Sequence, residues 1–401
     1  MISTTGTPPG RHLPFLDGIR ACAALWVLLG HCHLFAFGWQ RSQSPWARPL
    51  DLLLYMHLGV DIFLVLSGFC LALPVVRHGN GLPMRTRDYF LARAWRILPP
   101  YLVTLFLILL VNAVVPLAAW GRHAAGPTSA IPVPVLLANV FLLQDVFPST
   151  NVINGPFWSI AVEWHLYFVF PLLVAVLRRR GPAVLLAVGA AIAIVLTWLR
   201  FRYPVLSDAV PATIPEPPYY IALFVMGIVA ASLAADPRFQ AMRARLVRYA
   251  GIAACVLCLP LGAVLWTYRI IDGGNVHRFF DHADVIDPLA GAVTAACLLL
   301  MCGLPPRHRL RRFFESPSLV AIGGYSYSLY LVHIPILAAL NRWIDYAGVS
   351  ARSAGTTLFV LVAVGVPACL LFARVFARCF ERRYRPAGRP AHRPAPVREG
   401  A

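Results

Sequence analysis

Lysine is absent from this chain: all 35 basic residues among the 401 are arginine, and acidic residues number 17. Charged residues make up 13% of the sequence and hydrophobic residues 59%, whereas a soluble domain has about 25% and roughly 45–50% respectively. The mean hydropathy is +0.68. This scarcity of charge excludes a soluble globular protein and predicts an integral membrane protein.

The formal charge of +18 does not indicate a nucleic-acid partner. Nucleic-acid binders gather basic residues along one face, whereas the arginines here stand in short clusters between apolar runs. We therefore expect membrane lipid and membrane orientation, and no nucleic acid, to account for them.

Metal-ligand and disulfide patterns are also scarce. The nine cysteines are an odd number, and almost all fall in apolar runs, where free cysteine behaves as a small hydrophobic residue. Cys255 and Cys258 have C-x-x-C spacing but no second ligand pair nearby. His31 and His33 would point to nearly opposite sides of a helix. The sequence thus predicts neither a disulfide framework nor a metal site.

Long apolar runs are abundant instead. A membrane span needs about 20 apolar residues to cross roughly 30 Å of hydrocarbon. Ten such runs occur, near residues 18–36, 56–76, 97–119, 158–177, 182–198, 217–235, 249–267, 284–303, 319–340 and 356–375. The predicted fold class is an all-α, polytopic integral membrane protein with about ten transmembrane helices.

The distribution of arginine predicts the orientation. With the N-terminus inside, 25 arginines lie on the inner side of the ten spans and nine on the outer side. Counting the apolar stretch 131–143 as a span would exchange the inner and outer side of every later loop and remove this bias. We therefore predict cytoplasmic N- and C-termini, a multi-pass location in a bacterial cytoplasmic membrane, and an interfacial or re-entrant piece at 131–143.

The chain divides into one membrane domain, 1–380, and a disordered basic cytoplasmic tail, 381–401, rich in Pro, Arg and Ala. Arg20 within the first run, and nine runs after it, argue against a cleavable signal peptide. No internal repeat is visible, which gives no support to a transporter built from duplicated halves.

Ionisable side chains inside spans are costly, so each is a candidate functional residue. The runs hold or border on seven of them: Arg20, His31, His33, Asp61, Glu163, His165 and His333. Arg20 is expected near the inner face, and His31, eleven residues on, about 16 Å deeper. Five of the seven, all but Arg20 and His33, are expected to converge in the outer half, as general acid–base chemistry requires. The alternative is that a neighbouring helix satisfies each one separately.

Other polar groups leave two interpretations open. Asp17 precedes the first run as a helix N-cap or acts directly in a site. Arg93 and Arg96, three residues apart on one helix face, bind phosphate or simply carry positive-inside charge. The Tyr and Ser of 324–330 form a site or join helices by hydrogen bonds. Segment 272–287, rich in Asp and His, is a solvated loop or binds sugar.

Motifs spread from residue 15 to 335 together resemble the acyltransferase family 3 of polytopic membrane O-acyltransferases. Arg20, ten intervening residues and His31 are similar to its Arg-x10-His signature. The remaining motifs are GVDIFLVLSGF at 59–69, RAWRILPPY at 93–101, WSIAVEWHLY at 158–167 and SYSLYLVHIP at 326–335. The family often has Trp where this chain has Val332, which leaves the acceptor geometry open.

The resemblance implies an acyl-CoA-dependent O-acyltransferase with no permanently bound cofactor. The co-substrate is acyl-CoA, acetyl-CoA first, and the acceptor is a hydroxyl of a glycan, glycolipid or natural product. His31 is the expected general base, with Glu163 as its preferred partner and Asp61 as the second. Arg20, Arg93 and Arg96 are expected to bind the donor. The expected acceptor-side or supporting residues are Trp158, Ser159, His165, Ser326, Tyr330 and His333.

Two other functions are compatible with the residues alone. A secondary transporter would use the same intramembrane His, Asp and Glu as a proton or substrate path. A structural or signalling membrane protein would leave the convergence of these groups unexplained. Direct transfer and a transient acyl-imidazole on His31 are both open as mechanisms.

Overall fold

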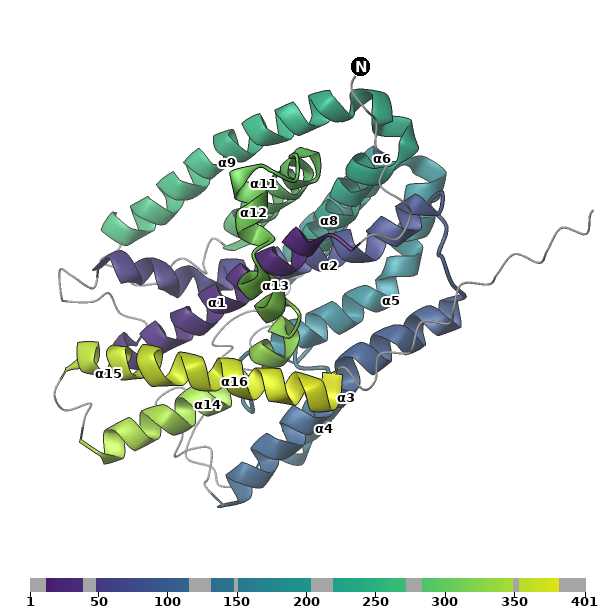
Figure 1. Ribbon diagram of the computed structural model, residues 1–401. Coiled ribbons are helices and arrows are strands. Elements are labelled where there is room, and N and C mark those ends of the chain that lie inside the picture. The colour runs from purple at the N-terminus through teal and green to yellow at the C-terminus, as the bar shows by residue number, and fades with distance from the viewer. Residues whose placement is uncertain are drawn as a thin grey trace, which may run out of the picture.

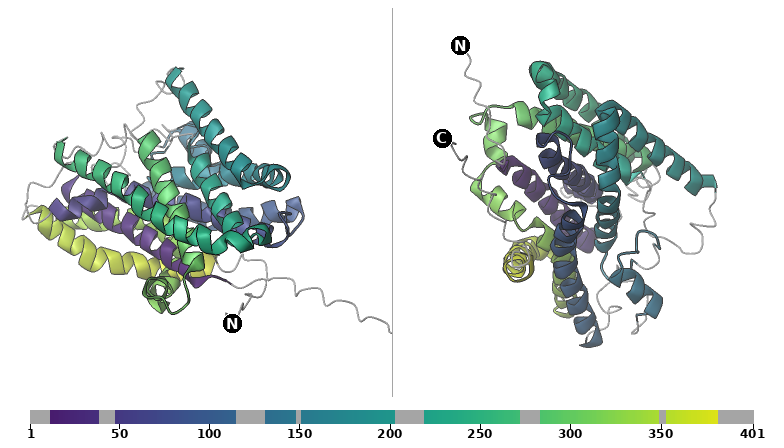
Figure 2. Two further views of the ribbon diagram at one scale, coloured as in Figure 1. Left: turned by 90° about the horizontal axis from the view of Figure 1, so that it is seen from above. Right: turned by 90° about the vertical axis from the view of Figure 1, so that its right-hand side faces the viewer.

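A computed structural model describes residues 12–38, 48–114, 131–147, 151–202, 219–271, 283–348 and 353–381. Every regular element among these residues is a helix, as the composition predicts (Figure 1). Lipid offers no hydrogen-bond partners to the backbone, and a helix satisfies its own backbone groups. Helix α9 runs along one edge of the bundle and α14–α16 along the opposite edge (Figures 1 and 2).

Eight helices exceed 20 residues. They are α1 (Pro14–Phe37), α2 (His57–Arg77), α3 (Thr86–Val114), α5 (Phe157–Arg180), α6 (Pro182–Arg202), α9 (Arg243–Ile271), α11 (Ala283–Gly303) and α14 (Ser326–Tyr346). The shorter α-helices are α4 (Val133–Val140), α8 (Tyr220–Ala235), α12 (Arg309–Phe314), α13 (Pro317–Gly323), α15 (Ala354–Val360) and α16 (Val366–Phe376). The 3-10 segments η1 (Arg48–Met56) and η4 (Pro237–Met242) and the π segments η5 (Leu361–Gly365) and η6 (Ala377–Glu381) extend their neighbours.

Within the described ranges, eight helical stretches are long and apolar enough to cross a membrane, and the bent pair α13–α14 makes a ninth. These nine coincide with nine of the ten predicted runs. The remaining run, 217–235, contains α8, an apolar helix of 16 residues. The protein is therefore a multi-pass, all-helical membrane protein. The count of ten and the side of the termini stay predictions.

The predicted short piece at 131–143 contains α4, which has eight residues and cannot cross a membrane alone. Asp17 lies inside the first turn of α1 and is not its N-cap, because the helix begins earlier, with Leu13 as N-cap and Pro14 as its first residue. Of the predicted tail, Glu381 ends η6, and 382–401 lie outside the described residues.

Helices α2 and α8 cross in close backbone contact at the centre of the bundle. A Cβ on Gly68 would lie 2.0 Å from the carbonyl oxygen of Phe224, and one on Gly227 would lie 2.0 Å from that of Val65. Small residues permit such an approach in membrane proteins, where packing replaces the hydrophobic effect. Leu223, Phe224 and Val225 of α8 are fully buried.

Helix α1 is held against α12 and α13 in a similar way. A Cβ on Gly18 would lie 1.8 Å from the carbonyl oxygen of Phe314, and one on Gly323 would lie 2.0 Å from that of Asp17. The chain then bends by 74° between α13 and α14. This bend brings the Ser and Tyr residues at the start of α14 to the cavity described below.

Candidate active site

A cavity of about 270 Å³ lies between helices α1, α2, α3, α5 and α14. We call it the arginine cavity. Its charged and hydroxyl-bearing lining residues are Arg20, Ser67, Tyr89, Arg93, Arg96, Ser159, Glu163, Tyr167, Ser326, Tyr327 and Tyr330. Apolar residues such as Phe63, Leu64 and Phe170 complete the wall. Three guanidinium groups therefore face one carboxylate, that of Glu163, across the lining.

Arg20 reaches the cavity from α1. Its Nη1 donates to Asp17 Oδ1 at 2.6 Å and its Nη2 lies 2.9 Å from Cys70 Sγ on α2. The Arg20 side chain is 19% exposed. Asp17, one turn earlier, fixes the guanidinium at the wall of the cavity. Asp17 thus serves Arg20 rather than the helix end.

Arg93 and Arg96 enter from α3, as their spacing predicts. The Arg93 guanidinium lies 5.8 Å from the centre of the Tyr167 ring, within cation–π distance. Its Nε is buried without a hydrogen-bond partner. Arg96 is exposed to the cavity that it lines. An arginine pair with unused donors at the wall of a cavity is suited to an anion such as phosphate.

Glu163 faces these arginines from α5. Its Oε1 accepts from Ser67 Oγ at 2.7 Å and from Tyr167 Oη at 2.5 Å. The sequence prediction paired Glu163 with His31, but the structure gives these two described residues no hydrogen bond. Tyr167 lies one helical turn from Glu163 on α5 and Ser67 faces it from α2, and both donate to the same carboxylate oxygen. Glu163 therefore belongs to the wall of the arginine cavity.

Tyr330 and Ser159 close a further part of the wall. Tyr330 Oη and Ser159 Oγ lie 2.8 Å apart, and this hydrogen bond joins α14 to α5. Ser326 also lines the cavity, and its Oγ donates to the carbonyl oxygen of Gly323 at 2.9 Å. The motif residues at 158–167 and 326–335 are thus brought together, although their hydroxyls also join helices.

His31 and His333 form a pair beside Tyr330. The two imidazole rings are 4.9 Å apart in an edge-to-face arrangement, with His333 Nε2 at 3.3 Å from His31 Nδ1. The centre of the His333 ring is 5.8 Å from that of Tyr330, which lines the cavity. His333 is 1% exposed, and His31 is half-buried. Among the described contacts His31 is thus beside an imidazole, while Glu163 and Asp61 have other neighbours.

Backbone carbonyls assign the protons in this pair. His333 Nδ1 is 2.8 Å from the carbonyl oxygen of Tyr330, and His31 Nδ1 is 2.8 Å from that of Val27. A carbonyl accepts a hydrogen bond, so the neutral tautomer of each ring carries its proton on Nδ1. His31 then shares its Nδ1 proton with His333 Nε2 and has its lone pair on Nε2, the atom that a general base uses.

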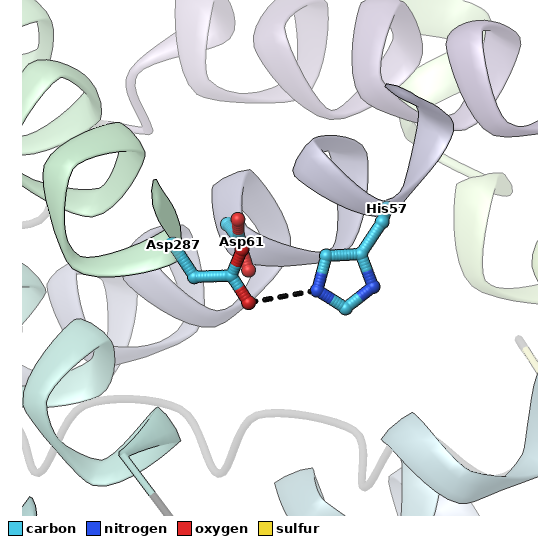
Figure 3. Close-up of side chains that lie close together, drawn as sticks. All are labelled: His57, Asp61 and Asp287. Carbon is cyan, nitrogen blue, oxygen red and sulfur yellow. Dashed lines mark hydrogen bonds and ion pairs between the residues drawn. The ribbon is translucent and has the colours of Figure 1, made fainter. Parts of the chain in front are cut away.

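Asp61 lies in a different group. With His57 and Asp287 it forms a buried cluster, which we call the carboxylate cluster (Figure 3). His57 Nε2 is 2.8 Å from Asp287 Oδ2. The prediction that Asp61 contacts His31 is not met in the structure, because Asp61 faces α11 from α2. The predicted Trp158 is here too, stacked on the His57 ring at 5.9 Å.

The five ionisable groups predicted to converge thus have different neighbours, and among the described contacts only that of His31 and His333 joins two of the five. His165 Nδ1 pairs with Asp145 Oδ2 at 2.6 Å, and neither residue lines the arginine cavity. His33 Nε2 lies 3.2 Å from Asp51 Oδ1, so His31 and His33 have different partners, as their spacing predicts. Cys255 and Cys258 are free and exposed.

The sequence analysis did not single out His57 or Tyr167, and it gave Asp287 a different role. The first was detectable, because His57 and Asp61 are four residues apart and share a helix face. Asp287 was interpreted as part of a solvated loop or sugar site, yet it is fully buried in α11. Residues 272–282 of that segment lie outside the described residues. Tyr167 follows Glu163 by one helical turn.

Comparison with known proteins agrees with the motif resemblance. Residues 13–376 match the acyltransferase 3 family model, described as an acyltransferase domain. The acyltransferase MdmB of Streptomyces mycarofaciens is 25% identical over 89% of this chain and 88% of its own length. No solved structure matches the chain.

Two further relatives are longer than the matched part. A Bacillus subtilis protein, YrhL, whose name is that of a peptidoglycan O-acetyltransferase, is 27% identical over 41% of this chain and 24% of its own length. A Staphylococcus aureus protein named as an O-acetyltransferase, SACOL0978, is 22% identical over 83% of this chain and 52% of its own length. Because the family model covers most of the chain, the protein belongs to the acyltransferase 3 family.

Proposed function

We propose that this acyltransferase moves an acyl group, acetyl first, from an acyl-CoA thioester to a hydroxyl of a glycan, glycolipid or glycosylated metabolite. One observation carries the proposal. The arginine cavity has three guanidinium groups in its wall, and its tyrosine Tyr330 adjoins the His31–His333 pair. Anion binding and a neutral imidazole base therefore lie within reach of one elongated ligand.

The donor is proposed to bind by its phosphates. Arg93, Arg96 and Arg20 supply charge-assisted hydrogen bonds, and the apolar wall at Phe63, Leu64 and Phe170 accommodates the pantetheine arm. Glu163 holds Tyr167 and Ser67 in that wall. The excess of arginines inside the predicted topology supports a donor that enters from the cytoplasm across a bacterial cytoplasmic membrane.

His31 is proposed to act as the general base. The acceptor hydroxyl oxygen attacks the thioester carbonyl carbon while its proton passes to His31 Nε2. The carbon–sulfur bond then breaks, and the proton on His31 returns to the leaving thiolate to give free CoA. His333 Nε2 accepts the Nδ1 proton of His31 as a hydrogen bond throughout, which holds the ring in the reactive tautomer. The names of two relatives, both those of O-acetyltransferases, support acetyl as the first group to test.

The test measures free CoA thiol in inverted membrane vesicles supplied with acetyl-CoA or longer acyl-CoAs and an extract of the host's glycans and metabolites. We expect thiol release with wild type and a loss of at least about 100-fold in His31→Ala, the usual size of general-base catalysis. His78→Ala is the control, since His78 is exposed at the end of α2. Full activity of His31→Ala would refute the mechanism. Substrate flux without any acyl donor would favour a transporter.

A further inference from the structure

The carboxylate cluster joins two helices by three side chains that the proposed acyl transfer does not use. His57 and Asp61 stand four residues apart on α2, and Asp287 stands on α11. We propose that these three residues bind a divalent metal cation, Zn²⁺ before others, which fastens α2 to α11.

The ligand atoms lie close to the spacing that a cation imposes, and small side-chain shifts would bring them to it. His57, Asp61 and Asp287 each offer one nitrogen or oxygen atom, and these atoms lie within 4.8 Å of one another. A metal with bonds of about 2.0–2.2 Å separates its ligand atoms by roughly 3–4 Å. Figure 3 shows one nitrogen of the His57 ring turned toward Asp287, with which it forms the hydrogen bond drawn there.

Asp61 supplies the second, independent observation. It is fully buried, and neither of its carboxylate oxygens has a hydrogen-bond partner. Asp287 is fully buried as well, and its Oδ1 is also without a partner. Buried polar groups are nearly always paired, because an unpaired one has lost its water without replacement. Three carboxylate oxygens in one buried place therefore call for a positive charge between them.

Among the described residues, the other group able to carry positive charge at this place is His57, which pairs with Asp287 and is itself a proposed ligand. No arginine among them pairs with Asp61 or Asp287, and the arginines of the cavity lie toward the other end of α2. Asp61 and Cys70, which contacts Arg20, are nine residues apart, or about 14 Å along a helix. A single proton shared by the carboxylates is the competing explanation, and the experiment below separates the two.

Aromatic residues around the cluster hold the ligands in place. Tyr219 Oη donates to Asp287 Oδ2 at 2.8 Å. Tyr220 Oη lies 3.2 Å from His57 Nε2, and Trp158 stacks on the His57 ring. Metal ligands are commonly oriented by such outer contacts. One imidazole with two carboxylates is a donor set suited to Zn²⁺, whereas Mg²⁺ and Ca²⁺ prefer oxygen ligands alone.

The proposed role is structural and distinct from acyl transfer. The three cluster residues do not line the arginine cavity, but Val60 and Phe63, next to Asp61 on α2, do. A metal between α2 and α11 would therefore fix the cavity wall without touching the donor.

The experiment measures metal content and thermal unfolding, so its result does not depend on any acyl acceptor. The full chain is purified in detergent after tag removal, equilibrated with Zn²⁺, Mn²⁺, Mg²⁺ and Ca²⁺, desalted and analysed by mass spectrometry for metals. We expect about one equivalent of Zn²⁺ in wild type. We also expect EDTA to lower the melting temperature and added Zn²⁺ to restore it.

Asp61→Asn and Asp287→Asn should each lose at least about tenfold in Zn²⁺ affinity, as expected when a ligand is removed. The matched control is Asp51→Asn, which alters a second buried His–Asp pair, that of His33 and Asp51, outside the carboxylate cluster. It should retain the metal. Co²⁺ in wild type should give the visible absorption of a low-symmetry nitrogen and oxygen site, and this readout needs no variant to fold.

Two results would overturn the proposal. One is wild-type protein without bound metal and with a melting temperature indifferent to EDTA and Zn²⁺, which would assign the cluster to a shared proton. The other is bound metal that remains in both cluster variants, which would place it elsewhere. Neither result would bear on CoA release by His31, so failure here is distinguishable from failure of the proposed function.

Discussion

The arginine cavity and the carboxylate cluster share helix α2 but solve the burial of charge in opposite ways. In the cavity, Arg93 and Arg96 face an accessible space that a charged ligand can fill. In the cluster, Asp61 and Asp287 are fully buried with oxygens left unpaired. Since a buried charge needs a counter-charge, the first region suits the anionic donor proposed for it and the second suits the proposed cation. The comparison therefore gives the arginine cavity the proposed reaction and the carboxylate cluster the proposed structural role.

The largest expected effect comes from removing two arginine side chains from the arginine cavity. The double variant Arg93→Ala/Arg96→Ala should raise the KM for acyl-CoA about 100-fold, because each charge-assisted hydrogen bond is worth about 1.5–3 kcal/mol. The kcat should change less than the KM. Steady-state thiol release over a range of acyl-CoA concentrations measures both.

Arg179→Ala is the matched control for that variant, because Arg179 is exposed in the last turn of α5. An unchanged KM in the double variant would mean that Arg93 and Arg96 of α3 do not bind the donor. Their role would then be limited to setting the orientation of the protein in the membrane.

The next effect tests α2 as the element shared by both regions. Gly68→Ala would place a methyl group 2.0 Å from the carbonyl oxygen of Phe224, so α2 and α8 must move apart. We expect a loss of about 1–3 kcal/mol in the free energy of unfolding. Denaturation followed by tryptophan fluorescence in detergent measures it. Gly81→Ala meets only one atom, at 3.8 Å, and should leave stability unchanged.

A smaller effect tests where proton transfer occurs. His333→Ala removes the acceptor at 3.3 Å from His31 Nδ1 and should lower kcat about tenfold while the KM for acyl-CoA stays constant. His333→Gln, whose side-chain oxygen also accepts a hydrogen bond, should recover part of the loss. Equal kcat in wild type and His333→Ala would disconnect this imidazole from the reaction.

The smallest effect lies outside both regions, at the loop after α8. Arg238 donates to Asp236 at 2.6 Å, and this hydrogen bond lowers the pKa of the Asp236 carboxyl below its usual range. The contribution to stability is present above the ordinary Asp pKa of about 3.9 and disappears as pH falls through the lowered value.

Arg238→Ala should therefore cost at most about 1 kcal/mol at pH 7, since the Arg238 side chain is 57% exposed. Below the lowered pKa of Asp236 the variant and wild type should unfold alike. Melting curves at several pH values check this, and a difference that persisted in strong acid would contradict the ion-pair explanation.

Helix positions were predictable because the length and hydropathy of an apolar run identify a membrane span. Each of the ten predicted runs contains helix where the structure describes it, although α8 has only 16 residues and the run 319–340 is bent between α13 and α14. Gly323 and Gly324 precede that bend, but only the packing of α13 against Asp17 of α1 shows why it is there.

The candidate site was predictable in its members and less so in its contacts. Arg20, Arg93, Arg96, Glu163, Ser159 and Tyr330 were singled out as sequence motifs and do line one cavity. The assignment of Glu163 and Asp61 to His31 differed from the structure, because depth in a span says nothing about the direction in which a helix faces. His333 was a supporting residue in the sequence analysis and is the imidazole beside His31.

The sequence by itself determined the membrane class, the helices and the residue types available for chemistry, because hydropathy and helical spacing are local properties of the chain. Only the tertiary structure decided which groups meet. Asp61 faces Asp287 across 226 positions of sequence, and His31 faces His333 across 302. Such pairings depend on how helices rotate and cross, and here close backbone contacts at Gly18, Gly68, Gly227 and Gly323 set those crossings.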